Sequence, residues 1–584
     1  MAQDESPFLS LQQELEKVGT VDELYRRSVE RFPGRIFIRA VDNTGGEIRV
    51  TYAESAQLLA AITLRMQDLQ FMAQDRIICY LEEQIPSIWF FLACAHLGVV
   101  PVPMSPMYSV KAVQELAESV NARAVFTVPE YVPRLMECGA KILSLPHPGT
   151  KFHGVVELGM GPLPSAQMGL EMLQELARSR NVDDVFSIQP TSGTTGRPKL
   201  VIRSHRSVLR SGLAIAFGIR PENEPPQRLL MISPLTHGNG RQVLTLALYL
   251  AAQLAIPTGV GTSARLDEIR RLDPTYIHLV PRMLRELYRQ HLASGAKLDD
   301  PLFGSSAGLM VIVGAAPDPT LLRILARQGI DIIPGYGSGE TGHVSLGERG
   351  AWREGYAGLI LPDVEAKLDN DGELLVRSPG LMHSYYGDED ETKDAFTEDE
   401  FYRTGDYAEI TTDRYLRIIG RKKDRFNTYD GSNIYPGLIE ERIEALTWVR
   451  QVVLIGDQRP YLVALIVPLG EFASVAPGNG FLDEAAHGLL YSRARLDLQR
   501  INKDFEPNER VRAFALFGRA FTSELYTILN RMKVKRNRGE IERIYQEQIN
   551  TLYTSPPFSA TVPDQQSDEV SLIEKGASKD PWGL

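Results

Sequence analysis

The feature that most constrains the fold is a long alternation of short β-branched runs with longer helical patterns, from Val50 to about Gly420. Runs such as RIICYLEE, ARAVFTV, YIHLVP and LMVIVGAA are typical of buried strands, whereas SAQLLAAITLRMQDL is typical of a helix. Strands that alternate with helices usually form layers with mostly parallel sheets. We therefore predict an α/β fold for this part of the chain.

The pattern changes near RYLRIIGRKKDRF, where a strand-like run meets a basic cluster and a smaller α/β pattern begins. A chain of 584 residues is also too long for one compact domain. We predict an N-terminal domain of layered, mostly parallel sheets over residues 1–421 and a small α+β C-terminal domain over residues 422–553. Residues 554–584 are rich in Ser, Pro, Asp and Gln, which predicts a disordered tail.

Charge and cysteine content exclude several classes of protein. The formal net charge of −11 makes nucleic acid a poor partner. The three cysteines are widely spaced and match no metal-binding or disulfide pattern, which predicts a reducing, cytoplasmic location. The acidic N-terminus does not resemble a secretory signal. The most apolar run, residues 88–104, contains His96 and two prolines and predicts a buried helix followed by a strand, not a membrane span.

The stretch TSGTTGRPK, Thr191 to Lys199, concentrates glycines, hydroxyl groups and a lysine in one loop. It is not a Walker A loop, because Pro198 and Leu200 stand where the second glycine and the metal-binding hydroxyl are needed. The flanking VFSIQ and KLVIRS are both typical of strands. Backbone N–H groups, hydroxyls and the lysine could wrap a polyphosphate. The alternative is a polar surface hairpin.

This loop resembles the phosphate loop of the adenylate-forming (AMP-binding) superfamily, which includes acyl-CoA and aryl-CoA synthetases, adenylation domains of peptide synthetases, and luciferases. Later segments resemble further motifs in the family's order: SPLTHGNG, VGAAP, GYGSGETG, FYRTGD, IGRKKDRFNTYDGSNIYPG and ILNRMKVKR. The resemblance covers the chain from about residue 20 to residue 550. The C-terminal part is most similar to long-chain fatty acid:CoA ligases.

The resemblance implies ATP as a substrate. Tyr336 would stack on adenine, Asp406 would accept hydrogen bonds from both ribose hydroxyls, and Arg421 would reach the ribose and phosphates. The residues assigned to ATP in this way are Thr191, Ser192, Gly193, Thr194, Thr195, Gly196, Lys199, Gly314, Ala315, Ala316, Tyr336, Gly337, Ser338, Gly339, Glu340, Asp406, Arg421 and Lys533.

Catalysis is assigned to Lys533 as the family's invariant lysine, with Lys535 as the alternative. The preceding Leu529 to Arg531 depart from the family's usual Thr-Pro-Thr. Mg²⁺ would be held by Glu340 and Thr195. Gly339 stands where the family usually has a threonine whose hydroxyl helps hold the α-phosphate, and Ser338 or Thr341 could replace that hydroxyl.

The acyl group of the substrate is assigned to a pocket built from five residues: His237, Asn239, Arg241, Gly314 and Gly335. His237 is also counted among the catalytic residues. PLTHGNGRQ contains no aspartate, which disfavours an amino acid as substrate. Arg241 would meet a distal polar or anionic group of the acid, or else form a salt bridge outside the pocket. The C-terminal domain is expected to be mobile, with Lys423 as hinge and Gly431 beside the thiol channel.

The activity implied by the resemblance is ATP-dependent conversion of a carboxylic acid to an acyl-adenylate, with Mg²⁺, followed by transfer to the thiol of coenzyme A. An acyl-AMP ligase that loads a separate phosphopantetheinyl carrier protein is the nearest alternative. A nucleotide-binding regulator without catalysis is a third, suggested by Gly339 and by Leu529 to Arg531. The retained Lys199, Glu340, Asp406, Arg421 and Lys533 argue against the regulator.

Overall fold

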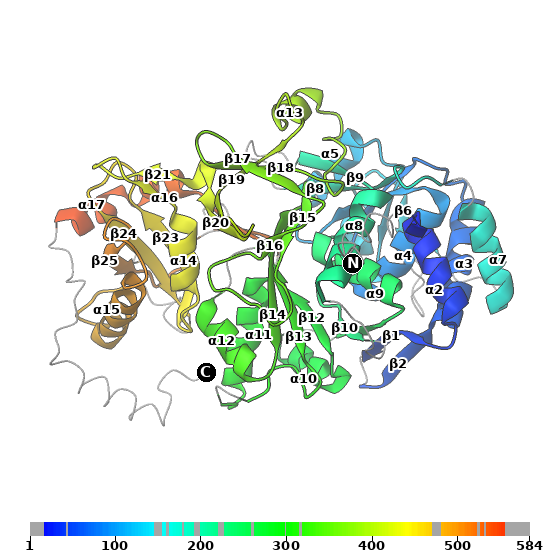
Figure 1. Ribbon diagram of the computed structural model, residues 1–584, viewed down its shortest axis with the longest axis horizontal. Helices are drawn as coiled ribbons and strands as arrows, with labels where there is room; N and C mark the ends of the chain where they lie inside the picture. The colour runs from blue at the N-terminus through cyan, green and yellow to red at the C-terminus, as the bar shows by residue number, and fades with distance from the viewer. Residues whose placement is uncertain are drawn as a thin grey trace, which may run out of the picture. The chain divides into compact units, whose positions relative to one another are not determined.

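The computed structural model describes residues 17–554, except 42–44, 145–154, 159–162, 178–179, 192–198, 220–226, 259–261, 298–299, 315–317, 470–480, 522–525 and 531–532. The chain forms two compact units, which run from blue to yellow-green and from yellow to red in Figure 1. Unit 1 consists of Met1–Leu292, Ala296–Thr404 and Ile410–Arg417. Unit 2 consists of Ala293–Gly295, Gly405–Glu409 and Ile418–Leu584. The domain boundaries predicted from the sequence remain predictions.

Unit 1 is built around a nine-stranded sheet. In spatial order its strands are β16 (Leu359–Ile360), β15 (Gly342–Leu346), β14 (Asp331–Ser338), β13 (Leu309–Val313), β12 (Tyr276–Leu279), β10 (Arg228–Leu230), β11 (Gln253–Ile256), β1 (Ile36–Val41) and β2 (Glu47–Thr51). All neighbours from β14 to β1 pair in parallel, and β15, β16 and β2 add antiparallel edges. The predicted α/β fold with a mostly parallel sheet is confirmed.

Helices cover both faces of this sheet. On one face, α10 (Thr262–Leu272), α11 (Pro281–Ala293) and α12 (Pro319–Arg327) pack their apolar side chains with those of β12 to β14. On the other face, α8 (His205–Ile219) packs on β15 and α9 (Gly238–Leu250) packs on β12. Side chains alternate between the two faces along each strand, so each strand contributes to both layers.

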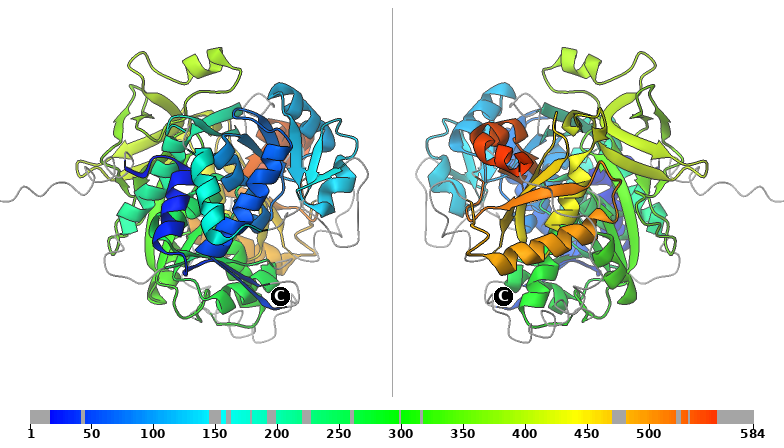
Figure 2. Two further views of the ribbon diagram at one scale, coloured as in Figure 1. Left: turned by 90° about the vertical axis from the view of Figure 1, so that its right-hand side faces the viewer. Right: turned by 90° about the vertical axis from the view of Figure 1, so that its left-hand side faces the viewer.

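A second, fully parallel sheet lies in the first third of the chain. Its order is β4 (Val100–Met104), β3 (Arg76–Tyr80), β5 (Ala124–Thr127), β6 (Ile142–Ser144) and β7 (Val155–Glu157). The helices of this region are α2 (Val21–Arg31), α3 (Tyr52–Asp68), α4 (Gln84–Leu97), α5 (Val110–Ser119), η1 (Pro129–Tyr131), α6 (Val132–Leu135) and α7 (Ala166–Ala177). Of these, the blue α2 and α3 and the cyan α7 lie side by side in Figure 2.

Local sequence explains where two of these helices begin and end. Thr51 caps α3, because its hydroxyl accepts the N–H of Glu54 while the Glu54 side chain accepts the N–H of Thr51. Gly98 ends α4 at a φ of 67°, a conformation that glycine adopts readily. Helix α4 followed by β4 confirms the buried helix and strand predicted for residues 88–104. Among the described helices, none is long and apolar enough to cross a membrane.

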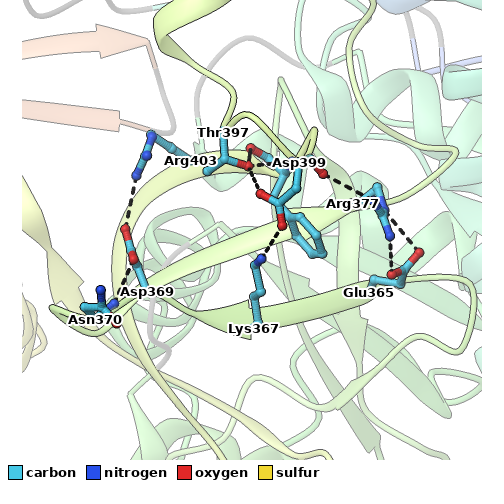
Figure 3. A network of polar contacts seen from close by, with 9 residues as sticks. Glu365, Lys367, Asp369, Asn370, Arg377, Thr397, Asp399 and Arg403 are labelled. Atoms are coloured by element: carbon cyan, nitrogen blue, oxygen red, sulfur yellow. Dashed lines mark hydrogen bonds and ion pairs between the residues drawn. The ribbon is translucent and has the colours of Figure 1, made fainter.

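The remainder of the layered region contains a hairpin of β8 (Val185–Thr191) and β9 (Lys199–Ser204) and the short helix α13 (Glu389–Asp394). A four-stranded sheet follows in the order β17 (Glu365–Leu368), β18 (Glu373–Arg377), β19 (Tyr402–Ile410) and β20 (Leu416–Arg421). Gly405–Glu409 of β19 and residues 418–421 of β20 belong to unit 2. Ion pairs brace the outer part of the sheet, as Figure 3 shows: Lys367 with Asp399 at 2.5 Å, and Arg377 with Glu365 at 2.6 Å. Both cations also lie near the ring of Phe401.

Unit 2 is an α+β structure with a three-stranded sheet of β23 (Val449–Ile455), β24 (Leu462–Pro468) and β25 (Val511–Leu516). Its helices are η2 (Lys422–Asp424), α14 (Pro436–Glu444), α15 (Gly488–Asn502), α16 (Arg538–Ile544) and α17 (Gln546–Thr554). Two hairpins complete it, β21 (Phe426–Asn427) with β22 (Asn433–Ile434) and β26 (Tyr526–Asn530) with β27 (Lys533–Arg536). Thr554 ends α17, and the rest of the predicted tail lies outside the described residues.

Candidate nucleotide and acyl site

The predicted phosphate loop connects β8 to β9. The two strands are antiparallel and place Thr191 directly opposite Lys199, so both ends of the loop meet at the tip of the hairpin. This confirms the two strands that the sequence predicts on either side of the loop. The five predicted ligands in the middle of the loop lie outside the described residues; they are Ser192, Gly193, Thr194, Thr195 and Gly196.

Lys199 is held by two partners that the sequence did not indicate. Its ammonium group forms an ion pair with Glu391 of α13 and lies 5.0 Å from the centre of the Tyr385 ring. The aromatic face and the carboxylate both attract a cation. Glu391 and Tyr385 therefore position Lys199 at the end of the loop.

Glu340 lies in the turn between β14 and β15, and this turn is fixed by short-range hydrogen bonds. The Ser338 hydroxyl accepts the N–H groups of Glu340 and Thr341, each at 3.1 Å. The Thr341 hydroxyl accepts the N–H of Ser338 at 2.9 Å and donates to the carbonyl of Gly342. The hydroxyls of Ser338 and Thr341 thus hold the turn itself.

Arg203 of β9 also holds this turn through hydrogen bonds to backbone carbonyl oxygens. Its guanidinium donates to the carbonyl oxygens of Gly339 at 3.0 Å and Gly380 at 2.9 Å, and a further N–H reaches Ser207 at 2.8 Å. Burial lowers the pKa of Arg203 to about 10, and the nearby Glu340 partly offsets that shift. At neutral pH Arg203 remains charged. The sequence does not mark Arg203 as functional, because a single arginine in a strand pattern gives no functional signal.

The Glu340 side chain is suited to a metal ion. Its backbone is fixed by Arg203 and by the N–H of Met382, which donates to the Glu340 carbonyl at 2.6 Å. The carboxylate itself is half-buried and makes no hydrogen bond or ion pair within the part of the chain that is described. A carboxylate on a rigid backbone with open oxygen atoms fits Mg²⁺, which prefers oxygen ligands.

The predicted adenine and acyl residues lie at the carboxyl ends of β13 and β14. Val313 of β13 pairs with Gly335 of β14, which places Gly314 beside Gly335 and Tyr336. Gly314 has a φ of 99°, and a Cβ atom on Gly337 would lie 2.0 Å from the carbonyl of Gly342, so glycine is needed at both positions. Ligands of open α/β sheets bind at this edge. Ala315 and Ala316 lie outside the described residues.

His237 caps the N-terminus of α9, and His237, Asn239 and Arg241 are all buried there. Arg241 donates to the Leu235 carbonyl and to the Gln189 side chain of β8. Among the described residues no carboxylate pairs with Arg241, so the salt bridge considered as an alternative is not observed. Burial lowers the pKa of Arg241 to about 9. A buried guanidinium therefore contributes positive charge beside the predicted pocket.

Gln189 connects this end of α9 to the Glu340 turn. Its amide nitrogen lies 3.7 Å from the position of a Cβ atom on Gly339, and Thr191 lies 3.3 Å from the same position. The phosphate hairpin, the Glu340 turn and the start of α9 are therefore neighbours. Residues predicted separately from three distant motifs meet at one place in unit 1.

Unit 2 brings together two further predicted ligands. Asp406 of β19 is buried and forms an ion pair with Arg421 of β20 at 3.1 Å. Lys423, the predicted hinge residue, lies in η2 immediately after β20. Gly431 occupies the tight turn between β21 and β22 with a φ of 83°.

The predicted catalytic lysine lies at the start of a strand in unit 2. Lys533 is the first residue of β27 and pairs with Asn530 of β26. Lys535, the alternative, lies in the same strand opposite Thr527. The side chains of both lysines lie outside the described residues, so the choice between them remains a prediction.

Two models of known protein families match this chain. Residues 25–386 match the AMP-binding enzyme family, and residues 423–556 match the AMP-binding enzyme C-terminal domain. The chain is 25% identical to long-chain-fatty-acid–CoA ligase FadD15 of Mycobacterium tuberculosis, over 88% of this chain and 94% of the relative. It is 24% identical to the human mitochondrial medium-chain acyl-CoA ligase ACSF2, over 75% of this chain and 76% of that protein.

Solved structures share the fold at lower sequence identity. The adenylation domain of a carboxylate reductase from Mycobacterium chelonae has a TM-score of 0.72 at 19% identity, covering 95% of this chain and 98% of that domain. The anthranilate CoA ligase AuaEII, solved with anthranoyl-AMP, has a TM-score of 0.72 at 17% identity, covering 91% and 98%. The matched family region spans more than half of the sequence and includes the phosphate hairpin and the Glu340 turn. The chain belongs to the AMP-binding enzyme family.

Proposed function

We propose that this protein is an AMP-forming acyl-CoA ligase. It uses ATP to convert a carboxylic acid into an acyl-adenylate, releases pyrophosphate, and transfers the acyl group to the thiol of coenzyme A. The observation that carries this proposal is the convergence of the phosphate hairpin, the clamped Glu340 turn and the buried start of α9 in unit 1. The similar proteins FadD15 and ACSF2 are both acyl-CoA ligases. The cytoplasmic location predicted from the cysteines is part of this proposal.

In the first step a carboxylate oxygen forms a bond to the α-phosphorus of ATP, and the bond to the pyrophosphate oxygen breaks in line with it. Lys199 and the hairpin loop hold the departing phosphates, and Lys533 stabilises charge on the α-phosphate. Tyr336 and Asp406 hold the adenine and the ribose. Glu340 and Thr195 would hold Mg²⁺, which would supply positive charge to the phosphates.

In the second step the thiol sulfur forms a bond to the acyl carbon, and the bond from that carbon to the AMP oxygen breaks. The thiol proton passes to solvent. The C-terminal domain turns about Lys423, so that Lys533 withdraws and the turn around Gly431 approaches the acyl-adenylate. The position of Lys423 in the short η2 segment, directly after β20, supports this proposal.

The thiol acceptor is tested by measuring AMP release from the purified full-length chain. With ATP, Mg²⁺ and a substrate acid, we expect AMP release to depend on coenzyme A and to stop when EDTA removes the metal. Release only with a phosphopantetheinyl carrier protein would replace this proposal by the acyl-AMP ligase. Nucleotide binding without turnover of any acid would favour the regulator.

Gly339→Thr tests the missing hydroxyl of the Glu340 turn. The new Cβ atom would lie 3.3 Å from Thr191, a contact that a shift of a few tenths of an ångström relieves. A hydroxyl at this position can donate to the α-phosphate, so we expect the rate of acyl-adenylate formation to rise by about tenfold. Gly339→Val is the matched control, since it has the same shape without the hydroxyl. Equal rates for the two variants would contradict this role.

A further inference from the structure

A row of three buried polar side chains lies on the nine-stranded sheet. None of the three is among the residues assigned to ATP, to Mg²⁺ or to the acyl group. Tyr276 and His278 of β12 and His343 of β15 form this polar row, with ring centres 6.3 Å apart for the first pair and 6.4 Å for the second. Their exposed fractions are 0%, 1% and 2%. The Tyr276 hydroxyl and both ring nitrogens of each histidine have no hydrogen-bond partner among the described residues.

The polar row lies on the face of the sheet that α8 and α9 cover. Ile277 and Leu279 pack on the opposite face, with α10 to α12. Because side chains alternate along a strand, Tyr276 and His278 lie on the α9 side. Two predicted acyl-pocket residues lie at the start of α9: His237 is its N-cap residue and Asn239 lies in its first turn. The Asn239 amide nitrogen is also buried without a partner in the described part of the chain.

Strand β14 places a glycine opposite His343 of this row. Strands β12 and β15 are separated by β13 and β14, which corresponds to about 14 Å of sheet. The ring centres of His278 and His343 are much closer than that, so the two side chains lean toward one another. His343 lies opposite Gly337 of β14, whereas Val311 of β13 and Ile333 of β14 lie level with His278. Gly335 lies two residues before Gly337 in β14. Gly335 belongs to the predicted acyl pocket, so the row borders that pocket.

The row offers uncharged donors and acceptors. Burial lowers the pKa of His278 to about 3. The pKa of His343 is lowered well below its usual value by burial, then by His278 and by the cations Arg210 and Arg203. Both imidazoles are therefore neutral at pH 7, and each presents one N–H donor and one acceptor nitrogen.

Unpaired polar atoms in the interior destabilise a folded protein, and nearly all such atoms in native proteins are paired with protein, water or ligand. Three adjacent side chains in this condition, on the face that borders the acyl pocket, indicate a polar ligand. An unbranched alkyl chain would cover these atoms with carbon and leave them unpaired. A hydroxyl group both donates and accepts, so it complements two neutral imidazoles and a phenol.

We propose that the carboxylic acid activated by this enzyme carries a hydroxyl group, and that Tyr276, His278 and His343 bind this hydroxyl. The inference rests on the function proposed above and names the substrate class of the same site. These three residues are specificity residues. They act on the choice of acid and leave the chemistry at the α-phosphate to Lys533 and the phosphate hairpin, as proposed above.

The first experiment compares matched acids on the full-length enzyme. Acid-dependent pyrophosphate release is measured for saturated fatty acids and for hydroxy acids of the same length, with the hydroxyl moved along the chain, and for benzoic against hydroxybenzoic acids. We expect one hydroxyl position to give a kcat/KM at least tenfold above that of its parent acid. If no hydroxylated acid exceeds its parent, the inference is wrong.

The second experiment changes the row. His278→Leu, His343→Leu and Tyr276→Phe remove polar atoms and keep apolar volume. We expect kcat/KM for the preferred hydroxy acid to fall by ten- to a hundredfold while that for the parent acid changes by less than threefold. Because the removed atoms have no hydrogen-bond partner among the described residues, the thermal unfolding midpoint should stay level or rise. An equal loss on both acids would show a structural role and overturn the inference.

His291→Leu is the matched control. His291 is also buried, but its ring nitrogens contact Arg270 and the Asp300 carbonyl, the latter at 3.1 Å. This variant should lose stability and keep the preference for the hydroxy acid. Failure of the two proposals can be told apart. Turnover of unsubstituted acids without a hydroxyl preference overturns only the substrate class, whereas no turnover of any acid overturns the proposed function as well.

Discussion

Lys533→Ala is expected to lower the rate of acyl-adenylate formation by about 10²–10³-fold, because one fixed positive charge at the developing α-phosphate charge contributes that much. The rate is measured as pyrophosphate release with ATP, Mg²⁺ and a substrate acid. ATP affinity, measured by calorimetry, should change far less, since the hairpin, Tyr336 and Asp406 remain in place. The second step should be retained when synthetic acyl-adenylate and coenzyme A are supplied.

Two further variants make this result specific. Lys535→Ala separates the two candidate lysines, which lie in the same short strand β27. Lys503→Ala removes an exposed lysine at the end of α15 and should leave the rate unchanged. A large loss with Lys535→Ala and none with Lys533→Ala would contradict the assignment of the catalytic lysine.

Asp363→Ala is expected to destabilise unit 1 by about 3–5 kcal/mol, because it leaves the buried Arg210 guanidinium without its counter-charge. Arg210 of α8 has no exposed side-chain surface, and it meets both oxygens of Asp363, at 2.9 Å and 2.6 Å. Another N–H of Arg210 donates to the His343 carbonyl. Loss of the pair should therefore also loosen β15 beside the site. The free energy of unfolding is measured in urea.

Asp183→Ala is the control for this prediction. Asp183 pairs with Arg206 through the same two-contact geometry, at 2.7 Å and 2.9 Å, but 64% of the Asp183 side chain is exposed. An exposed pair is worth less than about 1 kcal/mol. Similar losses for Asp363→Ala and Asp183→Ala would show that burial of the Arg210 pair does not matter.

Much of the fold followed from the sequence because local patterns carry the information. The β-branched runs singled out in the sequence form strands β3, β5, β12 and β13. The two strands predicted on either side of the phosphate loop are β8 and β9, which pair with each other. The order of strands in the nine-stranded sheet could not be predicted from the sequence. In that sheet β10 lies between β12 and β11, and neighbours of this kind depend on long-range packing that no local pattern records.

The candidate site was predicted where a motif carries its own chemistry, as in TSGTTGRPK or around Glu340. The residues that support this site, Arg203 and Glu391, were not predicted from the sequence. Arg203 and Glu391 act through partners more than a hundred residues away, Gly339 and Lys199. His278 stands in the run YIHLVP, where one histidine in an apolar strand is indistinguishable from a core residue. Only the fold places it beside His343.

The most direct test of the proposed activity is exchange of labelled pyrophosphate into ATP, measured without any thiol. We expect exchange that depends on an added carboxylic acid and on Mg²⁺, that is greatest with a hydroxylated acid, and that is lost in Lys533→Ala. No exchange with any acid in a broad panel, or exchange of equal rate without acid, would contradict the assignment of this chain as an acid-activating enzyme.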